Sequence, residues 1–203
     1  MVVLPYPEAE LEPRTLVFNP PLSDNEFEKL CLGDDFFQFE RISDGTIRRC
    51  PPEGLLTSSA NCEISCQLYD WWHTHELGGA LGSHVGFFLP DGSMLSPDAA
   101  YMLPEQLRGF TKADLAGFPR LCPAFVIELL PAAESLAERC RKMEAWIANG
   151  AQLAWLVDPY RKSVLVYQPG APSKTVDAPE IRGSGPVEGF TLDLTEVWRC
   201  YDV

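Results

Sequence analysis

Two acidic residues and a lysine have the types and spacing expected of a hydrolytic metal site. Glu128 stands inside the apolar run 125–130, which is typical of a strand covered on both faces. An ionised carboxylate is costly in such a place unless it is paired or bound to a metal. Asp98 follows Ser96-Pro97 in a second strand-like stretch, and Lys142 lies on a predicted helix downstream. We therefore expect the three side chains to lie within reach of one another.

The chemistry that suits these residue types is metal-assisted hydrolysis of phosphodiesters. Asp98 and Glu128 on neighbouring strands would offer hard oxygen ligands to Mg²⁺ (or Mn²⁺), with water and phosphate completing the octahedron. Lys142 could orient or polarise the attacking water and offset charge on a phosphorane-like transition state. Glu40, in the strand before the turn at Asp44-Gly45, is a further candidate metal ligand or a support for the lysine.

Each of these residues also has a structural interpretation. Asp98 could cap a turn with its side chain. Glu128 could be neutralised by a buried partner such as Lys142 or an arginine, without any catalysis. Lys142 taken alone could be a solvated helix residue, and Glu40 a surface strand residue. The four assignments depend on the residues lying together.

The elements that must position these side chains follow from capping, turn and periodicity signals. Residues 1–22 are proline-rich and are expected to be a loose N-terminal arm, and residues 23–203 a single domain. The signals predict helices at 23–32, from Ile64 to near Gly78-Gly79, and at 134–149; hairpins at 36–50, 80–102 and 153–167; a strand at 125–130; and an irregular loop at 103–120. This order predicts an α/β or α+β fold, with a mixed β-sheet flanked by helices.

Composition and charge restrict the classes of function. The chain is 46% hydrophobic and 22% charged, and no apolar run approaches the roughly 18 residues of a membrane span. The N-terminus lacks a secretory leader, so we expect a cytoplasmic protein without membrane contact. The net charge of −13 argues against a broad electrostatic footprint for nucleic acid. Binding to DNA would need a local basic surface, for which Arg139, Arg141 and Lys142 are candidates unless they form an exposed helix face paired with Glu134 and Glu138.

The cysteine and histidine pattern does not favour a disulfide framework or a zinc site. The seven cysteines are odd in number and irregularly spaced, so we expect mostly reduced core thiols. Cys62 and Cys66 lie one helical turn apart, but His73 and His75 diverge by about 200 degrees on a helix and cannot both face them. The five tryptophans are interpreted as core or dimer-contact residues.

A set of short motifs resembles a known family. The motifs are Leu89-Pro90-Asp91-Gly92, Ser96-Pro97-Asp98, Val126-Ile127-Glu128, Lys142 with Trp146 and Gly150, and Trp155-Leu156-Val157-Asp158-Pro159. Together they resemble the Uma-type putative endonuclease family, a branch of the PD-(D/E)XK restriction-endonuclease-like superfamily, over roughly residues 23–198. The resemblance implies a restriction-endonuclease-like core and a metal-dependent nuclease site. Asp98 and Glu128 match the acidic positions, and Lys142 matches the migrated lysine on the following helix.

The chain departs from the family pattern at three positions. Leu130 replaces the usual superfamily lysine two residues beyond the glutamate. Pro131 stands where relatives usually have serine, and Asn61 stands at a commonly histidine position. None of these changes removes a predicted metal ligand, but Pro131 changes the turn that delivers the helix carrying the lysine.

Three hypotheses from different classes follow. The first is a Mg²⁺-dependent endodeoxyribonuclease with Asp98, Glu128 and Lys142 as catalytic residues, and with Asp98, Glu128 and Glu40 as metal ligands. The second is a catalytically silent protein of the same fold that acts as a binding or regulatory module. The third is a structural protein with an incidental acidic pocket. In each case we expect a homodimer, because many nucleases of this superfamily act as dimers.

Overall fold

A six-stranded mixed sheet forms the centre of the computed structural model, which describes residues 14–112, 114–132 and 134–202. The strand order is β11-β10-β9-β8-β7-β4, and only β8 and β9 run parallel among these neighbours. The bounds are β4 Gly79–Leu81, β7 Ala99–Met102, β8 Phe125–Leu129, β9 Leu153–Asp158, β10 Ser163–Tyr167 and β11 Lys174–Val176.

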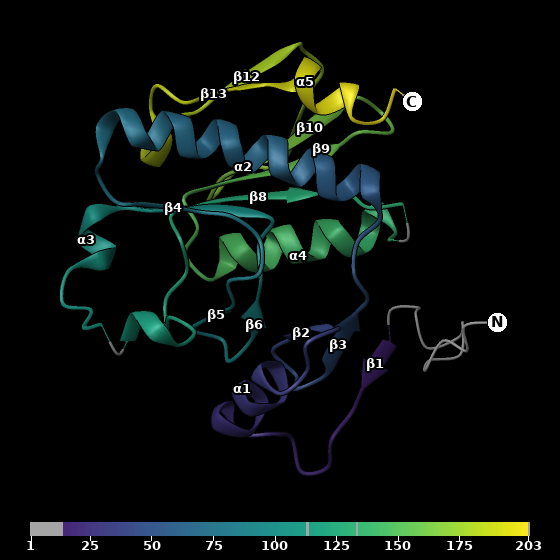
Figure 1. Ribbon diagram of the computed structural model, residues 1–203, viewed down its shortest axis with the longest axis vertical. Helices are drawn as coiled ribbons and strands as arrows, with labels where there is room; N and C mark the ends of the chain where they lie inside the picture. The colour runs from purple at the N-terminus through teal and green to yellow at the C-terminus, as the bar shows by residue number, and fades with distance from the viewer. Residues whose placement is uncertain (1–13, 113, 133, 203) are drawn as a thin grey trace.

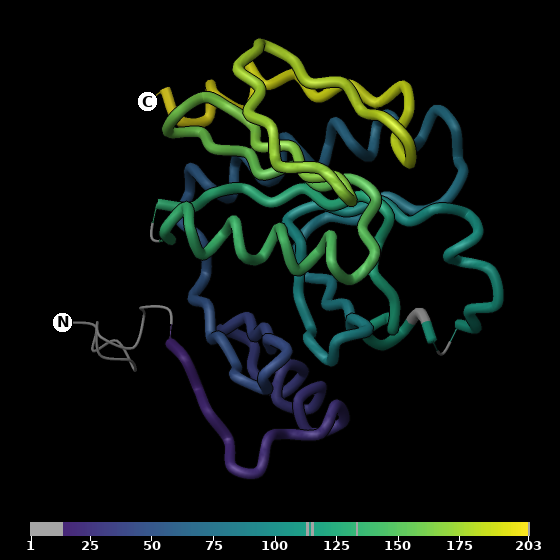
Figure 2. The backbone as a smooth tube through the Cα atoms, turned by 180° about the vertical axis from the view of Figure 1, so that it is seen from behind, coloured from purple at the N-terminus to yellow at the C-terminus, as the bar shows by residue number. Residues whose placement is uncertain are grey.

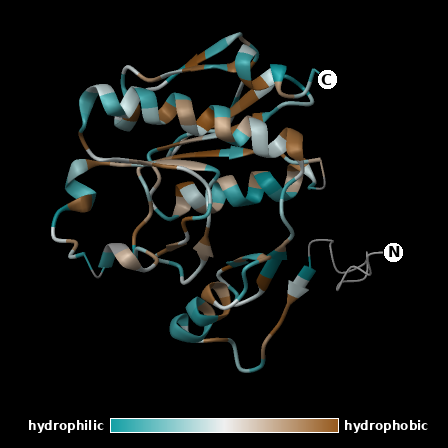
Figure 3. Ribbon diagram, in the orientation of Figure 1, coloured by the Kyte–Doolittle hydropathy of each residue, from teal (hydrophilic) through white to brown (hydrophobic). Residues whose placement is uncertain are grey.

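Two helices cover opposite faces of this sheet, α2 (Leu55–His75) on one face and α4 (Leu136–Ala148) on the other (Figure 1). Side chains alternate along β8, so Phe125, Ile127 and Leu129 join the apolar cluster under α2. Val126 joins the cluster under α4. Glu128 has the same parity as Val126 and therefore faces α4. Figure 3 shows hydrophobic colour along the strands that lie between the two helices.

A smaller sheet with its own helix lies at one end of the molecule. Its strand order is β1-β3-β2-β6-β5, and its apolar core lies against α1. Figures 1 and 2 show α1 and β1 to β3 at the end opposite β12, β13 and α5. The bounds are β1 Arg14–Leu16, α1 Asp24–Leu32, β2 Gln38–Arg41, β3 Ile47–Cys50, β5 Phe87–Phe88 and β6 Met94–Leu95.

The remaining elements are short and close the ends of the fold. They are α3 Pro104–Leu107, 3₁₀ turns at Asp114–Ala116 and Gly185–Val187, β12 Glu180–Arg182, β13 Thr191–Asp193 and α5 Leu194–Arg199. Among the described residues, no helix is both long and apolar enough to cross a membrane. All seven cysteines are free thiols.

The predicted fold class is confirmed, with a mixed sheet between helices. Ser23 forms a capping box with Glu26 at the start of α1, as its sequence signals indicate. The predicted hairpin at 80–102 is wrong in extent: β5 and β6 form a tight hairpin in the small sheet, whereas β4 and β7 belong to the central sheet. The chain passes from one sheet to the other at Pro97, which has no N–H to donate and so interrupts the ladder.

Three other boundaries differ from the sequence prediction. Helix α2 begins at Leu55, after the extended cap residue Gly54 and well before the predicted start at Ile64, so Asn61 lies in its second turn. The stretch predicted as an irregular loop contains α3. In the predicted N-terminal arm, β1 pairs with β3; residues 1–13 lie outside the described residues.

Candidate active site

Glu128 is fully buried, and donors from one face of α4 surround its carboxylate. Arg139 Nη1 donates to Oε2, and Trp146 Nε1 donates to Oε1 at 2.8 Å. Lys142 Nζ lies 2.8 Å from Oε1 and 3.0 Å from Oε2. These donors follow one another at intervals of three and four residues, which places them on one helical face. Glu128 therefore has both oxygens occupied by cationic or N–H donors.

Lys142 is held by three acceptor groups. Its Nζ lies 2.7 Å from Glu40 Oε1 and 2.7 Å from the Ser96 carbonyl oxygen, in addition to Glu128. An ammonium group has three N–H donors, so this set uses all of them. Burial opposes the charge of Lys142, but Glu128 and Glu40 outweigh it and raise its pKa above the usual range. Lys142 is therefore a fixed cation and not a general base.

Glu40 belongs to the same buried cluster. It is only 6% exposed, and Oε1 also accepts a 2.9 Å hydrogen bond from the Ser96 N–H. Burial would raise the pKa of Glu40, but the neighbouring Lys142 ammonium lowers it below the usual value. The interpretations of Glu40 as a surface residue and of Lys142 as a solvated one are wrong. The alternative that Glu40 supports the lysine agrees with these contacts.

Arg139 extends the cluster towards the small sheet. Its Nε lies 3.0 Å from Glu134 Oε2, and Arg48 Nη2 lies 3.4 Å from Glu134 Oε1. Because Arg139 is buried and Lys142 has little exposed surface, they do not form the predicted basic patch with exposed Arg141.

Asp98 lies in the short connection between β6 and β7, and it binds the backbone of β8. Its Oδ2 accepts a 2.6 Å hydrogen bond from the Leu129 N–H, and its own N–H donates to the Ile127 carbonyl at 3.2 Å. The side chain therefore binds an adjacent strand and does not cap a local turn. Burial, followed by the nearby Glu128 charge, raises the pKa of Asp98 to about 7.

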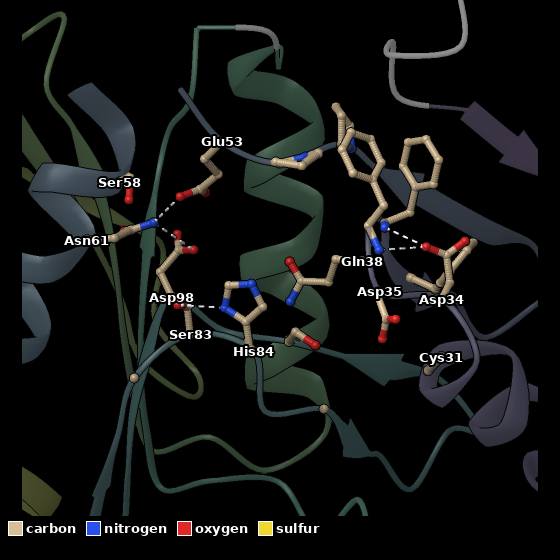
Figure 4. Close-up of a pocket in the computed structure, with 18 of the residues that line it drawn as sticks. Cys31, Asp34, Asp35, Gln38, Glu53, Ser58, Asn61, Ser83, His84 and Asp98 are labelled. Carbon is tan, nitrogen blue, oxygen red and sulfur yellow. Dashed lines mark hydrogen bonds between the residues drawn. The ribbon is translucent and has the colours of Figure 1, made fainter. Parts of the chain in front are cut away.

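Asn61 on α2 bridges Asp98 to a second carboxylate that the sequence analysis did not single out. Its Nδ2 donates to Glu53 Oε2 at 2.8 Å and to Asp98 Oδ1 at 3.4 Å (Figure 4). Glu53 is exposed, whereas Asn61 is buried. The two acids thus form an accessible rim beside the buried cluster.

Two cavities meet at this rim. One, of about 340 Å³, is lined by Glu40, Glu53, Asp98, Arg139 and Lys142 among others. The other, of about 810 Å³, is lined by residues that include Glu53, Asn61, Asp98, His84, Asp34 and Asp35. In Figure 4, Asp34 and Asp35 lie across the view from Asn61 and Asp98. Glu128 lines neither cavity.

The donor set fits a hard divalent cation at the rim better than in the buried cluster. Asp98 presents carboxylate oxygen to both cavities, whereas the oxygens of Glu128 are taken by α4. The ion pairs of the buried cluster balance, with the carboxylates Glu40, Glu128 and Glu134 against the cations Arg48, Arg139 and Lys142. Beside it, Glu53 and Asp98 are joined through Asn61 and add two negative charges when both are ionised, which a divalent ion would balance.

A preformed cluster of metal ligands is not present in the described part of the chain, where no three His, Cys, Asp or Glu side chains converge suitably. The cysteines and histidines on α2, which the structure describes, do not form such a cluster either. Cys62 and Cys66 are exposed, His73 stacks on Tyr69, and His75 Nδ1 lies 2.9 Å from the Trp71 carbonyl oxygen.

Some of the residues that were missed have a signal in the sequence, and others have none. Arg139 and Trp146 stand three and four residues from Lys142, so helical spacing alone points them at the same carboxylate. Glu53 lies in a loop before α2, and no periodicity relates it to Asp98. Its position depends on where α2 starts, which the sequence analysis placed too late.

Comparison with known proteins supports this fold. Residues 24–195 match the sequence profile of the Uma2 family, described as "Putative restriction endonuclease". A crystal structure from Anabaena variabilis ATCC 29413, titled as a putative nuclease belonging to DUF820, superimposes with a TM-score of 0.70 at 19% identity. The alignment covers 89% of this chain and 99% of that one, and at this identity it shows a shared fold. A search of curated proteins found no match.

Proposed function

Because this chain belongs to the Uma2 family of putative restriction endonucleases, we propose that it is a metal-dependent nuclease that hydrolyses phosphodiester bonds of DNA. The observation that carries the proposal is that two carboxylates, Glu53 and Asp98, line the 340 Å³ cavity without an ion-pair partner among the described residues, and that Lys142 lines the same cavity. Hard oxygen ligands with excess negative charge favour Mg²⁺ or Mn²⁺. The bound cation would supply Lewis-acid polarisation of the phosphate and a lowered pKa for the attacking water.

The roles of the chain's residues differ with their surroundings. Asp98 is the ligand that a cation reaches from the cavities. A ligand role for Glu128 or Glu40 requires Lys142 to give up one of its three bonds. The N–H released in that exchange is the group that would contact the attacking water or the charged phosphate. Arg139 and Trp146 keep Glu128 in place while this happens.

The nucleic acid must approach a surface with little positive charge. The net charge is −13, and Asp34 and Asp35 line the larger cavity together with Asp98. Affinity for phosphate therefore depends on the cation, and we expect binding of DNA to weaken in EDTA as well as in high salt. A homodimer remains part of the proposal, and gel filtration at micromolar concentration tests it.

Cleavage of plasmid, linear duplex and single-stranded DNA in Mg²⁺, Mn²⁺ or EDTA tests the nuclease proposal. Asp98→Asn keeps the side-chain size, and we expect it to lower the cleavage rate by about 100-fold or more, as removal of a group that stabilises transition-state charge does. Glu128→Gln and Lys142→Ala should also lose activity. Asp35→Asn, on the wall of the larger cavity, is the matched control and should cut like the native chain. Equal cleavage by native protein and Asp98→Asn would refute the assignment.

One observation favours the alternative of a catalytically silent binding or regulatory protein. In the described geometry, Lys142 has no N–H left for a substrate, and Glu128 has no free carboxylate oxygen face. Under this alternative DNA or a protein partner binds without cleavage, and the binding is indifferent to Asp98→Asn. Cation-dependent cleavage by the native chain would exclude it.

A further inference from the structure

The rim beside the buried cluster contains a polar atom whose surroundings are incomplete. Asn61 is only 5% exposed, and its Oδ1 has no hydrogen-bond partner among the described residues. Buried amide oxygens are almost always bonded, so an unbonded one marks a place where an ion or water belongs. The other end of the same amide lies between two carboxylates from different elements, Glu53 before α2 and Asp98 before β7.

We propose that Glu53, Asn61 and Asp98 form a divalent-cation site in which the Asn61 amide changes its orientation when the ion binds. A half-turn of the amide exchanges Oδ1 and Nδ2. The oxygen then occupies the place of the nitrogen, next to Glu53 Oε2 and Asp98 Oδ1. This inference deepens the proposed function and rests on it only for the use of the cation, not for its binding.

The distances around Asn61 are close to the spacing of oxygen ligands on one ion. Neighbouring ligands of an octahedral cation lie about 2.9 Å apart for metal–oxygen distances of about 2.0–2.1 Å, as for Mg²⁺. The amide nitrogen lies 2.8 Å from Glu53 Oε2 and 3.4 Å from Asp98 Oδ1. With the amide turned, these become oxygen–oxygen distances. The first already has the octahedral spacing, and the second requires Asn61 and Asp98 to approach each other by about 0.5 Å.

The two orientations suit opposite conditions. Without a cation, the amide N–H groups are the donors that hold two acidic side chains near one another. Three oxygens facing one another would repel, so the turned amide is unfavourable until a positive charge lies between them. Because both carboxylates line the two cavities, the remaining ligand positions are open to water and phosphate. The rim therefore offers an entry point that the buried Glu128 does not.

Cation binding to the full chain, measured by calorimetry with Mn²⁺ and Mg²⁺ after removal of metal and without nucleic acid, tests the site. We expect Glu53→Gln and Asn61→Ala each to weaken Mn²⁺ binding by roughly tenfold or more, because even outer-shell partners of metal ligands have effects of that size. Asn61→Asp adds a third carboxylate and should tighten binding. Asp35→Asn, on the opposite wall of the larger cavity, should bind like the native chain. Circular dichroism checks that each variant is folded.

The side-chain amide resonances of Asn61, assigned from their loss in Asn61→Ala, provide a second measurement. We expect Mg²⁺ to shift them, because the N–H groups leave the two carboxylates. Native-like Mn²⁺ affinity in Glu53→Gln, or Asn61 resonances unmoved by saturating Mg²⁺, would overturn the inference. Failure of the nuclease proposal looks different: the variants change cation affinity as expected, but the native chain does not cut DNA.

Discussion

The buried cluster around Glu128 and the rim around Asp98 contain similar residue types but differ in how completely their hydrogen bonds are made. In the cluster, Glu128 receives donors from Arg139, Lys142 and Trp146, and the ammonium group has three acceptors. On the rim, Asp98 has one strong backbone donor and one longer side-chain contact. The charges of the buried cluster are paired, whereas the carboxylates at the rim have no ion-pair partner among the described residues.

This difference separates positioning from binding. A saturated ion-pair network holds β8, α4 and the small sheet in one arrangement, because each member loses a partner if any element moves. A cation gains little there unless a protein bond is exchanged. At the rim, Glu53 and Asp98 line both cavities, so a cation can bind without first breaking the cluster. Family membership alone does not distinguish these two roles for acidic residues.

The largest expected effect is on stability, from Glu128→Ala. This change leaves two buried cations, Arg139 and Lys142, without their shared acceptor, which costs about 3–5 kcal/mol of unfolding free energy. Urea denaturation followed by circular dichroism measures it. The control is Glu196→Ala, which breaks the exposed ion pair to Arg199 and should cost less than about 1 kcal/mol. Similar losses for the two variants would mean that the cluster is not a structural network.

A smaller effect is expected from Trp146→Phe, which keeps an aromatic ring but removes the Nε1–H donor to Glu128. A hydrogen bond to a charged group contributes about 1.5–3 kcal/mol, and the smaller ring adds a small cavity. We expect a loss of about 2–3 kcal/mol, measured by the same denaturation. Trp71→Phe is a matched control, because Trp71 Nε1 has no hydrogen-bond partner among the described residues. If both variants lose the same free energy, the indole N–H is not part of the network.

The sequence predicted the buried cluster better than the rim, for physical reasons. An acid inside the apolar run 125–130 requires a partner, and strand alternation gives the face on which that partner must lie. Lys142 was named for its place on a predicted helix and its match to the migrated lysine of the family, and its contact with Glu128 agrees with that prediction. For Glu40 the interpretation as a surface residue stood beside that as a ligand, because a four-residue strand does not show whether another sheet covers it.

Prediction of the rim required the correct start of helix α2, and sequence signals locate helix starts poorly. Ser58 and Ser59 have the right type for a helix cap, but α2 starts after Gly54 and so includes them. This shift places Asn61 in the second turn of α2 and Glu53 immediately before it. Asn61 contacts both Glu53 and Asp98, and these contacts bring together segments 37 to 45 positions apart in the chain. No local pattern encodes such a contact.

The smallest expected effect, and the one that isolates the rim, is the pH dependence of stability in Asp98→Asn. The pKa of Asp98 is raised from 3.8 to about 7 by burial and then by Glu128, so the folded state retains this proton longer than the unfolded state. The bound proton stabilises the folded state fully below the pKa that Asp98 has in the unfolded chain. This stabilisation is lost as the pH rises through the pKa that Asp98 has in the folded chain. In EDTA, native stability relative to Asp98→Asn should therefore fall between pH 4 and 7. The full pKa shift corresponds to about 4 kcal/mol, and because Asp98 is partly exposed and lines both cavities, solvent screening reduces the expected fall to about 1 kcal/mol. Glu40, whose pKa is lowered, contributes the opposite slope, but this slope is common to both proteins and cancels in the difference.

Identical pH profiles for the two proteins would show that the rim carries no excess charge. A native profile that Mg²⁺ flattens above pH 7, with no such effect in Asp98→Asn, would show that a cation can replace the proton.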